Sequence, residues 1–448
     1  MEAVNTRNDA GRPRAEVLII GSGFAGFYAA RHLGKLLPAT AANVTVVSAT
    51  DHLTYSPLLP EVAAGRLTPH RIAIPLHGAL GRARIVQGIV DDVDFAGHRA
   101  HVDLGEGSRS TLAWDRLILA TGSVTRLLPT PGLREVAFGL KSLIEGQYIH
   151  DHVLRQLELA DSTDDPDERR ARLTFIVVGA GYAGTETAAQ LQRMTNKQIG
   201  RFPRLRASDL TWMLADINQA VLPELGPRLG KYTLRVLGRR HMQVRLGTTV
   251  TEMMPDGVVL SDGSRVPTHT VLWTVGVTPP PLVQRLGLPV DRGRVVVDEC
   301  LQLRPDVWAA GDSAATVNPY DTKGLNYPPT AQHAQRQGKI LATNVAASLG
   351  YGLRRPYRHH DLGLVADLGG RTAVARPFGI PLTGLVAKCV TKGYHLLAIP
   401  GMGMKLRIAA DWVVNMTSRP PATQLGLVDA TAAKLTVAEH SAPTEARR

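Results

Sequence analysis

Two glycine-rich turns have the residue types and the spacing that bind dinucleotides: Gly21-Ser-Gly-Phe-Ala-Gly26 and Gly179-Ala-Gly-Tyr-Ala-Gly184. The first glycine of each permits a tight turn, the second lets the backbone approach a pyrophosphate, and the third lets a helix pack on a strand. The phosphates would lie at the positive N-terminus of that helix. One such turn is a weak signal, but two turns separated by the length of a domain predict two nucleotide-binding domains. The glycines concerned are Gly21, Gly23, Gly26, Gly179, Gly181 and Gly184.

The residue that ends the second strand differs between the two units. The strand over 44–47 is followed by Ser48, although an acidic residue usually holds the adenosine ribose at this position. The strand over 211–215 ends on Asp216, whose carboxylate accepts from a 2′-hydroxyl and repels a 2′-phosphate. Asp216 therefore predicts NADH rather than NADPH in the second unit, which leaves FAD for the first.

Three further segments are candidates for contact with the flavin. The strand over 114–120 ends in Thr121 and Gly122, where the chain leaves the first domain. The strand over 307–310 runs into Gly311 and Asp312, and this carboxylate can accept from a ribityl hydroxyl or act as a plain N-cap. The apolar, proline-rich segment 55–65 predicts a loop that either covers a flat ligand or simply packs on the domain.

The elements that must position these residues alternate between strands and helices, as in Rossmann-like α/β domains. We expect helices over 26–37 and 141–160, an antiparallel meander over 85–104, and a surface linker over the charged run 161–172. The predicted organisation is a disordered tail (1–14), an FAD-binding domain in two parts (15–130 and 279–350), an NAD-binding domain (131–278), a C-terminal membrane-association region (351–427) and a second disordered tail (428–448).

The C-terminal region contains two amphipathic segments. Over 382–397, apolar residues lie against a row formed by Lys388, Lys392 and His395, and the segment 404–416 repeats the pattern with a polar line opposite an apolar one. Such helices can lie in a membrane interface with their basic side chains at anionic lipid. They can equally pack on the protein's own core or on a dimer partner, and the hydrophobic pattern does not separate these alternatives.

The composition excludes several other classes of function. The chain has 448 residues, 44% of them hydrophobic, and a formal net charge of +12, which suits a globular protein with anionic partners. The arginines are spread along the chain without a zinc pattern, so we expect no nucleic acid. Cys300 and Cys389 lie far apart, which argues against a disulfide framework, a metal site and the cysteine pair of disulfide-reducing flavoproteins. The polar N-terminus is no secretory signal.

Together these motifs resemble the two-dinucleotide-domain flavoproteins and, among them, the type II NADH dehydrogenases, which are NADH:quinone oxidoreductases. The resemblance covers about 16–424 and includes both glycine turns, Thr121-Gly122 and Ala310-Gly-Asp312. Its most telling segment is 329–337, which is similar to the family's Ala-Gln-x-Ala quinone motif.

The resemblance assigns two catalytic residues. Gln332 would contact the quinone head group near the flavin, with an amide that can donate to a quinone carbonyl. Glu186 would lie where the nicotinamide meets the isoalloxazine ring, to orient the nicotinamide or relay protons.

The resemblance implies an enzyme that takes hydride from NADH onto FAD and passes two electrons to a membrane quinone, without proton pumping. It places the protein peripherally at the cytoplasmic face of the membrane, against anionic lipid, and leaves open whether it is a homodimer. This chemistry requires no metal site. The alternatives are a soluble NAD(P)H-dependent flavoprotein reductase of an iron–sulfur protein, and a redox sensor that binds both nucleotides without turnover.

Overall fold

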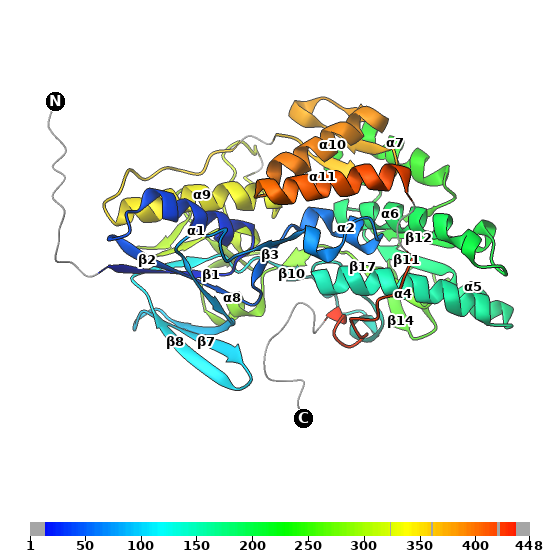
Figure 1. Ribbon diagram of the computed structural model, residues 1–448, viewed down its shortest axis with the longest axis horizontal. Helices are drawn as coiled ribbons and strands as arrows, with labels where there is room; N and C mark the ends of the chain where they lie inside the picture. Colours follow the sequence, from blue (N-terminus) through cyan, green and yellow to red (C-terminus); the bar gives the residue numbers. More distant parts are fainter. Residues whose placement is uncertain (1–13, 323, 360–361, 419–421, 436–448) are drawn as a thin grey trace.

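The computed structural model describes residues 14–322, 324–359, 362–418 and 422–435. These residues form two α/β halves that lie side by side, with helices α10 (Gly384–Ala398) and α11 (Met402–Thr417) along one edge of the molecule (Figure 1). The predicted N-terminal tail, apart from Arg14, lies outside the described residues. None of the described helices has the length and hydropathy needed to cross a membrane.

The first half is built on a six-stranded sheet with the order β21-β22-β9-β1-β2-β5. Its strands are β1 (Ala15–Ile20), β2 (Ala42–Ser48), β5 (Arg84–Gln87), β9 (Arg116–Leu119), β21 (Gln302–Arg304) and β22 (Val307–Ala309). The run Val17 to Ile20 is buried throughout, as expected for a strand covered on both faces. The strand β22 pairs in parallel with β9, so the prediction that a late strand returns to the first sheet is confirmed.

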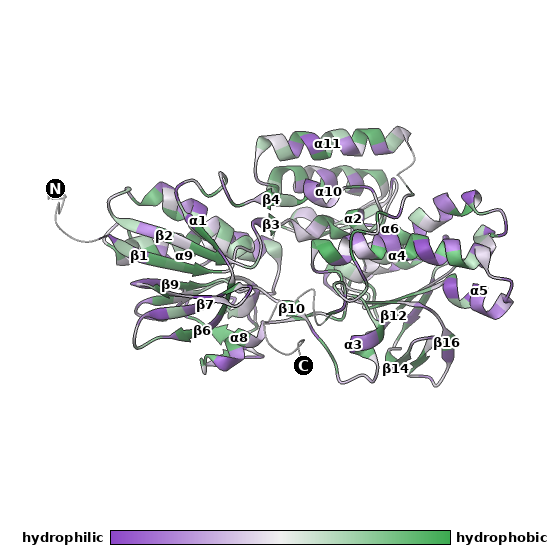
Figure 2. Ribbon diagram, turned by 60° about the horizontal axis from the view of Figure 1, so that its bottom comes forward, coloured by the Kyte–Doolittle hydropathy of each residue, from purple (hydrophilic) through white to green (hydrophobic). Residues whose placement is uncertain are grey.

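Helices α1 (Phe24–Leu36) and α9 (Ala331–Ser348) pack together on this sheet. On the other side lies the antiparallel sheet of β6 (Ile89–Asp94), β7 (Arg99–Gly105) and β8 (Ser108–Ala113), which corresponds to the predicted meander (Figure 2).

The second half contains a parallel sheet with the order β13-β12-β11-β17. Its strands are β11 (Thr174–Val178), β12 (Thr211–Asp216), β13 (Gln243–Leu246) and β17 (Thr270–Trp273), and the flanking helices include α4 (Leu143–Ser162) and α6 (Tyr182–Gln198). The two halves are joined by an antiparallel pair, β10 (Val124–Thr125) and β18 (Val277–Thr278).

The remaining elements lie around these sheets. They are β3 (His52–Thr54), β4 (Ala73–Pro75), β14 (Val250–Met254), β15 (Gly257–Leu260), β16 (Arg265–Pro267), β19 (Val290–Asp291), β20 (Arg294–Val296), β23 (Ala314–Ala315), β24 (Val365–Asp367), β25 (Ala373–Ala375), β26 (Leu382–Thr383), α2 (Leu59–Ala63), α3 (Leu133–Val136), α5 (Pro166–Arg172), α7 (Pro227–Gly238) and α8 (Pro281–Arg285).

Two segments predicted to be irregular are helical. The segment 55–65 contains a short 3₁₀ turn followed by α2, because its two prolines occupy first-turn positions, where a missing N–H costs nothing. The run 161–172 is not wholly a linker, since it contains α5. The Asp165 carboxylate accepts from the N–H groups of Asp167 and Glu168 and so starts this helix.

The first part of the expected C-terminal tail, 428–435, is among the described residues. Leu435 is 1% exposed and packs in a cluster with Leu133 and Trp273, and Lys434 forms a bridge with Phe138. An apolar anchor of this kind offsets the conformational entropy of ordering a polar segment. The rest of the predicted tail, 436–448, lies outside the described residues.

Candidate functional site

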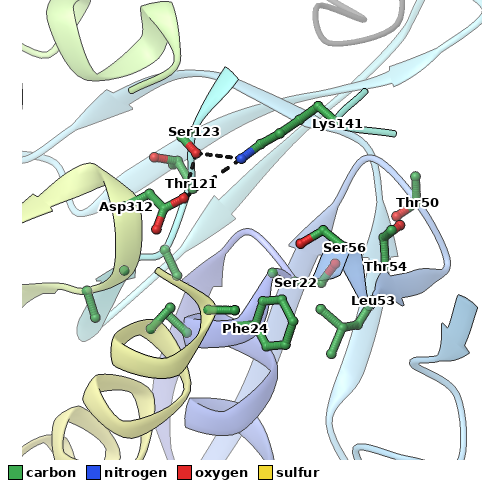
Figure 3. A pocket seen from close by; sticks show the side chains of 18 of the residues that line it. Ser22, Phe24, Thr50, Leu53, Thr54, Ser56, Thr121, Ser123, Lys141 and Asp312 are labelled. Atoms are coloured by element: carbon green, nitrogen blue, oxygen red, sulfur yellow. Dashed lines mark hydrogen bonds and ion pairs between the residues drawn. The ribbon is translucent and has the colours of Figure 1, made fainter. Parts of the chain in front are cut away.

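A cavity of about 280 Å³ opens where the carboxyl ends of β1, β9 and β22 meet. This edge of a parallel sheet is where ligands bind in α/β folds. Its lining combines residues that follow each of these strands with side chains from the segment 50–56 and from the start of α9 (Figure 3). The predicted residues that line it are Gly23, Thr121, Gly122, Gly311 and Asp312.

The three glycines of the first turn have the local geometry that their predicted roles require. Gly21 has a φ of +101°, and a Cβ there would overlap the carbonyl oxygen of Ala120. A Cβ at Gly26 would overlap the carbonyl oxygen of Gly21, so the helix can approach the strand only without a side chain. A Cβ at Gly23 would meet no atom within 4 Å. The middle glycine therefore borders open space at the cavity, which suits an approaching pyrophosphate.

Ser48 supports this turn from the end of β2. Its hydroxyl is buried and lies 2.5 Å from the hydroxyl of Ser22, and it also accepts from the N–H of Thr50. The hydroxyl of Thr121, on the opposite wall, is buried without a partner in the part of the chain that the structure describes. An orphaned polar atom in a cavity is satisfied by a bound ligand, so these residues fit a dinucleotide.

A charged cluster forms part of the lining of the same cavity (Figure 3). The Ser123 hydroxyl donates to Asp312 at 2.6 Å, and the Lys141 ammonium donates to Ser123 at 2.8 Å. Lys141 was not predicted as a site residue, because the sequence assigned it to the helix 141–160. The capping box of Ser142 and Glu145 is readable in the sequence and would have placed Lys141 outside that helix.

The second glycine turn repeats the geometry of the first. Gly179 has a φ of +110°, and its Cβ would lie 2.6 Å from the carbonyl oxygen of Thr274. A Cβ at Gly184 would overlap the carbonyl oxygen of Gly179, whereas one at Gly181 would meet nothing within 4 Å. The spacing therefore produces one local structure twice.

Asp216 lies against this second turn, at the end of β12. One oxygen of its carboxylate accepts from the N–H of Ala180 at 2.5 Å, and the other accepts from the backbone and side chain of Asn218. The carboxylate is thus fixed in orientation at the position where the sequence placed it. Because it is fixed beside the turn, its charge would act on whichever ribose the turn holds.

Glu186, on the second turn of α6, accepts from the N–H of Asp367 at 2.5 Å. Burial raises the pKa of Glu186 to about 8, and the nearby carboxylates of Asp367 and Glu61 act in the same direction. At neutral pH this carboxyl therefore holds its proton, and it can donate a hydrogen bond or release the proton to a partner.

A buried network connects Glu186 to the C-terminal helices. Burial acts to raise the pKa of Asp367, but the ammonium groups of Lys388 and Lys392 bring that pKa below its usual value. Lys388 donates to Asp367 at 2.5 Å, Lys392 pairs with Glu61, and the indole of Trp412 donates to Glu61 at 2.8 Å. Sequence reasoning missed Glu61 and Asp367, which lie 306 positions apart and are joined by Lys392 of α10.

For Lys388, Lys392 and His395, this network excludes the alternative in which their side chains lie at anionic lipid. The two lysines turn inward to the buried carboxylates, and Nδ1 of His395 lies 3.1 Å from the hydroxyl of Tyr55. The physical reason is that a carboxylate buried by the fold requires a cation, and α10 supplies it. The apolar side of α10 is left outside.

Gln332 lies in the first turn of α9, where Thr330 caps the helix. Its amide nitrogen donates to the carbonyl oxygen of Gly363 at 3.3 Å, and its amide oxygen is 3.1 Å from Nε2 of His359. The amide therefore connects both His359 and Gly363 to α9. The contact between Gln332 and a quinone stays a prediction, while the small Ala331 and Ala334 of the same motif line the cavity.

Replacement of Glu186 by glutamine is expected to change how stability depends on pH. The pKa of Glu186 is about 8 in the folded chain against 4.5 for a free carboxyl, so the folded state holds the extra proton between these values. Stability of the natural protein should then fall as pH rises, by roughly 2–3 kcal/mol between pH 5.5 and 8.5 relative to Glu186→Gln. Urea unfolding at both pH values measures the difference, and parallel pH curves would contradict the shifted pKa.

The comparisons with known proteins agree with one another and cover most of the chain. The family model for pyridine nucleotide-disulphide oxidoreductases matches residues 15–338. The type II NADH:quinone oxidoreductase Ndh of Mycobacterium tuberculosis is 30% identical over 423 residues, covering 90% of this chain and 89% of that protein. The demethylphylloquinone reductase NdbB of Synechocystis is 29% identical over 414 residues, covering 90% of this chain and 96% of that protein.

The fold has a counterpart among solved structures. NDH2 from Plasmodium falciparum, in complex with NADH, superposes with a TM-score of 0.83 over 92% of this chain and 100% of that one, at 17% identity. At this identity the likeness concerns the fold.

Proposed function

The chain belongs to the pyridine nucleotide-disulphide oxidoreductases and, among them, to the type II NADH:quinone oxidoreductases, and from this premise we propose that it transfers two electrons from NADH through FAD to a quinone. The observation that carries the proposal is the pair of glycine turns, each with an open middle glycine. Both cysteines are free thiols, so the chain lacks the cysteine pair with which disulfide-reducing relatives act.

The first half would hold FAD and the second NADH. Gly23, Thr121 and Asp312 line the cavity that the FAD would enter, and Ser48 braces its glycine turn. When bound, FAD supplies the chemistry, which is acceptance of hydride and release of two electrons. Gly181 would leave room for the NADH pyrophosphate, and Asp216 would accept from its ribose.

Two side chains would act where the nicotinamide and the quinone react with the flavin. Glu186 holds a proton at neutral pH, and we assign it the orientation of the nicotinamide or the supply of that proton. Gln332 would contact the quinone from the start of α9, after its amide is released from His359 and Gly363. Helix α6 would thus supply the residue at the nicotinamide, and α9 the residue at the quinone.

We propose binding to a membrane because the C-terminal helices expose apolar side chains. The helix α10 exposes Leu385, Val386 and Leu397, while its two lysines pair inward, and α11 exposes Leu406 and Met416. An apolar face of this kind buries well at a membrane interface, where the enzyme would meet a lipid-soluble quinone. The protein would then lie peripherally, and we place it on the cytoplasmic face. A soluble reductase of an iron–sulfur protein would not require this face.

An anaerobic absorbance titration tests the proposal. NADH should bleach the flavin stoichiometrically, and a short-chain quinone should restore its colour. NADPH should bleach it far less readily, because the Asp216 carboxylate repels a 2′-phosphate. Absence of bleaching would refute the oxidoreductase, and a preference for NADPH would refute the role of Asp216. Bleaching without reoxidation by any quinone would favour a sensor.

A further inference from the structure

Four basic side chains gather where α1 packs on α9. Arg31 and Lys35 lie one turn apart on α1, and Arg336 and Lys339 lie on α9. Neither helix contains an acidic residue, and none of the four side chains forms a salt bridge within the described ranges. Arg31, Lys35 and Lys339 are exposed, while Arg336 is half-buried and donates to the carbonyl oxygen of Gln332. We call these four residues the α1–α9 basic patch.

The packing of the two helices forces these charges together. Gly338 of α9 lies so close to α1 that a Cβ there would overlap the carbonyl oxygen of Ala25. Lys339 lies with its ammonium 5.3 Å from the centre of the Tyr28 ring. Burial and the charges of Arg336, Lys35 and Arg31 lower the pKa of Lys339. The patch is therefore a concentration of positive charge that the protein itself does not neutralise, and a bound anion would relieve the repulsion.

The basic patch borders the apolar face of the C-terminal helices. The Tyr28 hydroxyl donates at 3.3 Å to the carbonyl oxygen of Ala398, the last residue of α10. At this end Leu397 is 80% exposed and Met402 is 69% exposed. Figure 1 shows the end of α11 that begins at Met402 next to α1 and α9. Basic and apolar surface thus adjoin.

We propose that the α1–α9 basic patch binds the phosphates of anionic phospholipid headgroups when the apolar face of α10 and α11 enters the membrane. This inference rests on the membrane docking proposed above and gives it a lipid preference. An interfacial helix buries its apolar face by roughly 5–10 Å, which brings neighbouring cations to the level of the headgroups. The first α/β half thereby supplies the lipid-facing cations that one interpretation of the sequence placed at Lys388 and Lys392.

A second copy of the chain fits this surface less well. Pairing of two identical copies through one face would bring the same cations toward each other, because a twofold interface is self-complementary. The only acidic residue on α11, Asp411, is already paired with Arg71. The charge of the surface is therefore complementary to an anionic lipid and not to itself.

The test compares vesicle binding of three forms of the full-length, FAD-loaded protein. The patch variant carries Arg31→Gln, Lys35→Gln and Lys339→Gln. The control variant removes the same charge at exposed arginines on other elements, through Arg99→Gln, Arg134→Gln and Arg245→Gln. Co-sedimentation is measured with phosphatidylcholine vesicles and with vesicles in which one third of the lipid is phosphatidylglycerol. NADH bleaching of the flavin in each form verifies that it is folded.

The patch variant should bind the anionic vesicles roughly 100-fold more weakly than the natural protein, given the usual contribution of each basic residue near an anionic surface. Its binding to phosphatidylcholine should be unchanged, and the control variant should lose far less. Equal losses in the two variants, or no loss in either, would overturn the headgroup site alone. If the natural protein binds neither vesicle, the membrane docking itself fails, while bleaching by NADH still reports on the oxidoreductase.

Discussion

Gly23→Val is expected to yield a folded protein that is purified without flavin. A Cβ at this position meets no protein atom within 4 Å, so the fold has room for it. The same space lies beside the cavity at the carboxyl ends of the strands, where the pyrophosphate would sit against the helix N-terminus. The valine side chain would fill that space, and the loss of FAD should be nearly complete. Absorbance near 450 nm against protein at 280 nm measures it.

Gly26→Val provides the contrast for this prediction. Its Cβ would overlap the carbonyl oxygen of Gly21, so this variant should disrupt the packing of α1 on β1 and fail to fold. The natural far-ultraviolet circular dichroism should persist in Gly23→Val only. A yellow Gly23→Val protein would show that the first turn is not the FAD site.

Sequence reasoning predicted the position of those residues that belong to a strand–turn–helix motif. Gly26 and Gly184 approach the carbonyl oxygens of Gly21 and Gly179 a few residues away, and those two glycines approach the residue that follows the neighbouring strand of the sheet. Asp216 follows from the end of one strand. The assignment of strand 307–310 to the first sheet also succeeded, because a short apolar run leading into Gly311 has the pattern of a parallel strand.

The residues that it missed depend on contacts between distant segments. The lysines of α10 have the spacing of a solvent-facing row, and only the presence of Glu61 and Asp367 beneath the helix turns them inward. A hydrophobic pattern gives the two faces of a helix but does not say which one is covered. Lys141 is held at the cavity because it donates to Ser123, which in turn donates to Asp312. Ser123 and Asp312 follow the ends of two different strands. Such juxtapositions are properties of the fold rather than of any window of sequence.

The buried network also fixes the two C-terminal helices to the rest of the molecule, because breaking its ion pairs costs free energy. Removing one partner of a buried ion pair leaves an unpaired charge, which typically costs 3–5 kcal/mol. Lys392 contacts both Glu61 and Asp367, and Trp412 of α11 donates to Glu61. The helix pair is thereby fixed to the α2 and α6 side of the molecule, so that membrane docking would hold Glu186 and the nucleotide sites in a set orientation to the bilayer.

Gly181→Val is the counterpart of the first prediction and separates the two nucleotide sites. Its Cβ also meets nothing within 4 Å, so the variant should fold and remain yellow with FAD. The valine would block the NADH pyrophosphate, and losing two charge-assisted hydrogen bonds to the turn costs about 3 kcal/mol or more. The NADH concentration for half-maximal bleaching should therefore rise by on the order of 100-fold or more. Only the binding of NADH should be weakened, since the flavin cavity lies in the other half.

Dithionite supplies the control that makes this result specific. The flavin of Gly181→Val should be bleached by dithionite and reoxidised by quinone at the natural rate, because neither step requires the second glycine turn. If NADH bleaches the variant as readily as the natural protein, NADH does not use this turn. If the variant loses its FAD, the turns are not divided between two nucleotides. Only a yellow protein whose flavin NADH no longer reduces fits the proposal of one turn for each cofactor. That proposal is based on the repeated geometry at Gly23 and Gly181.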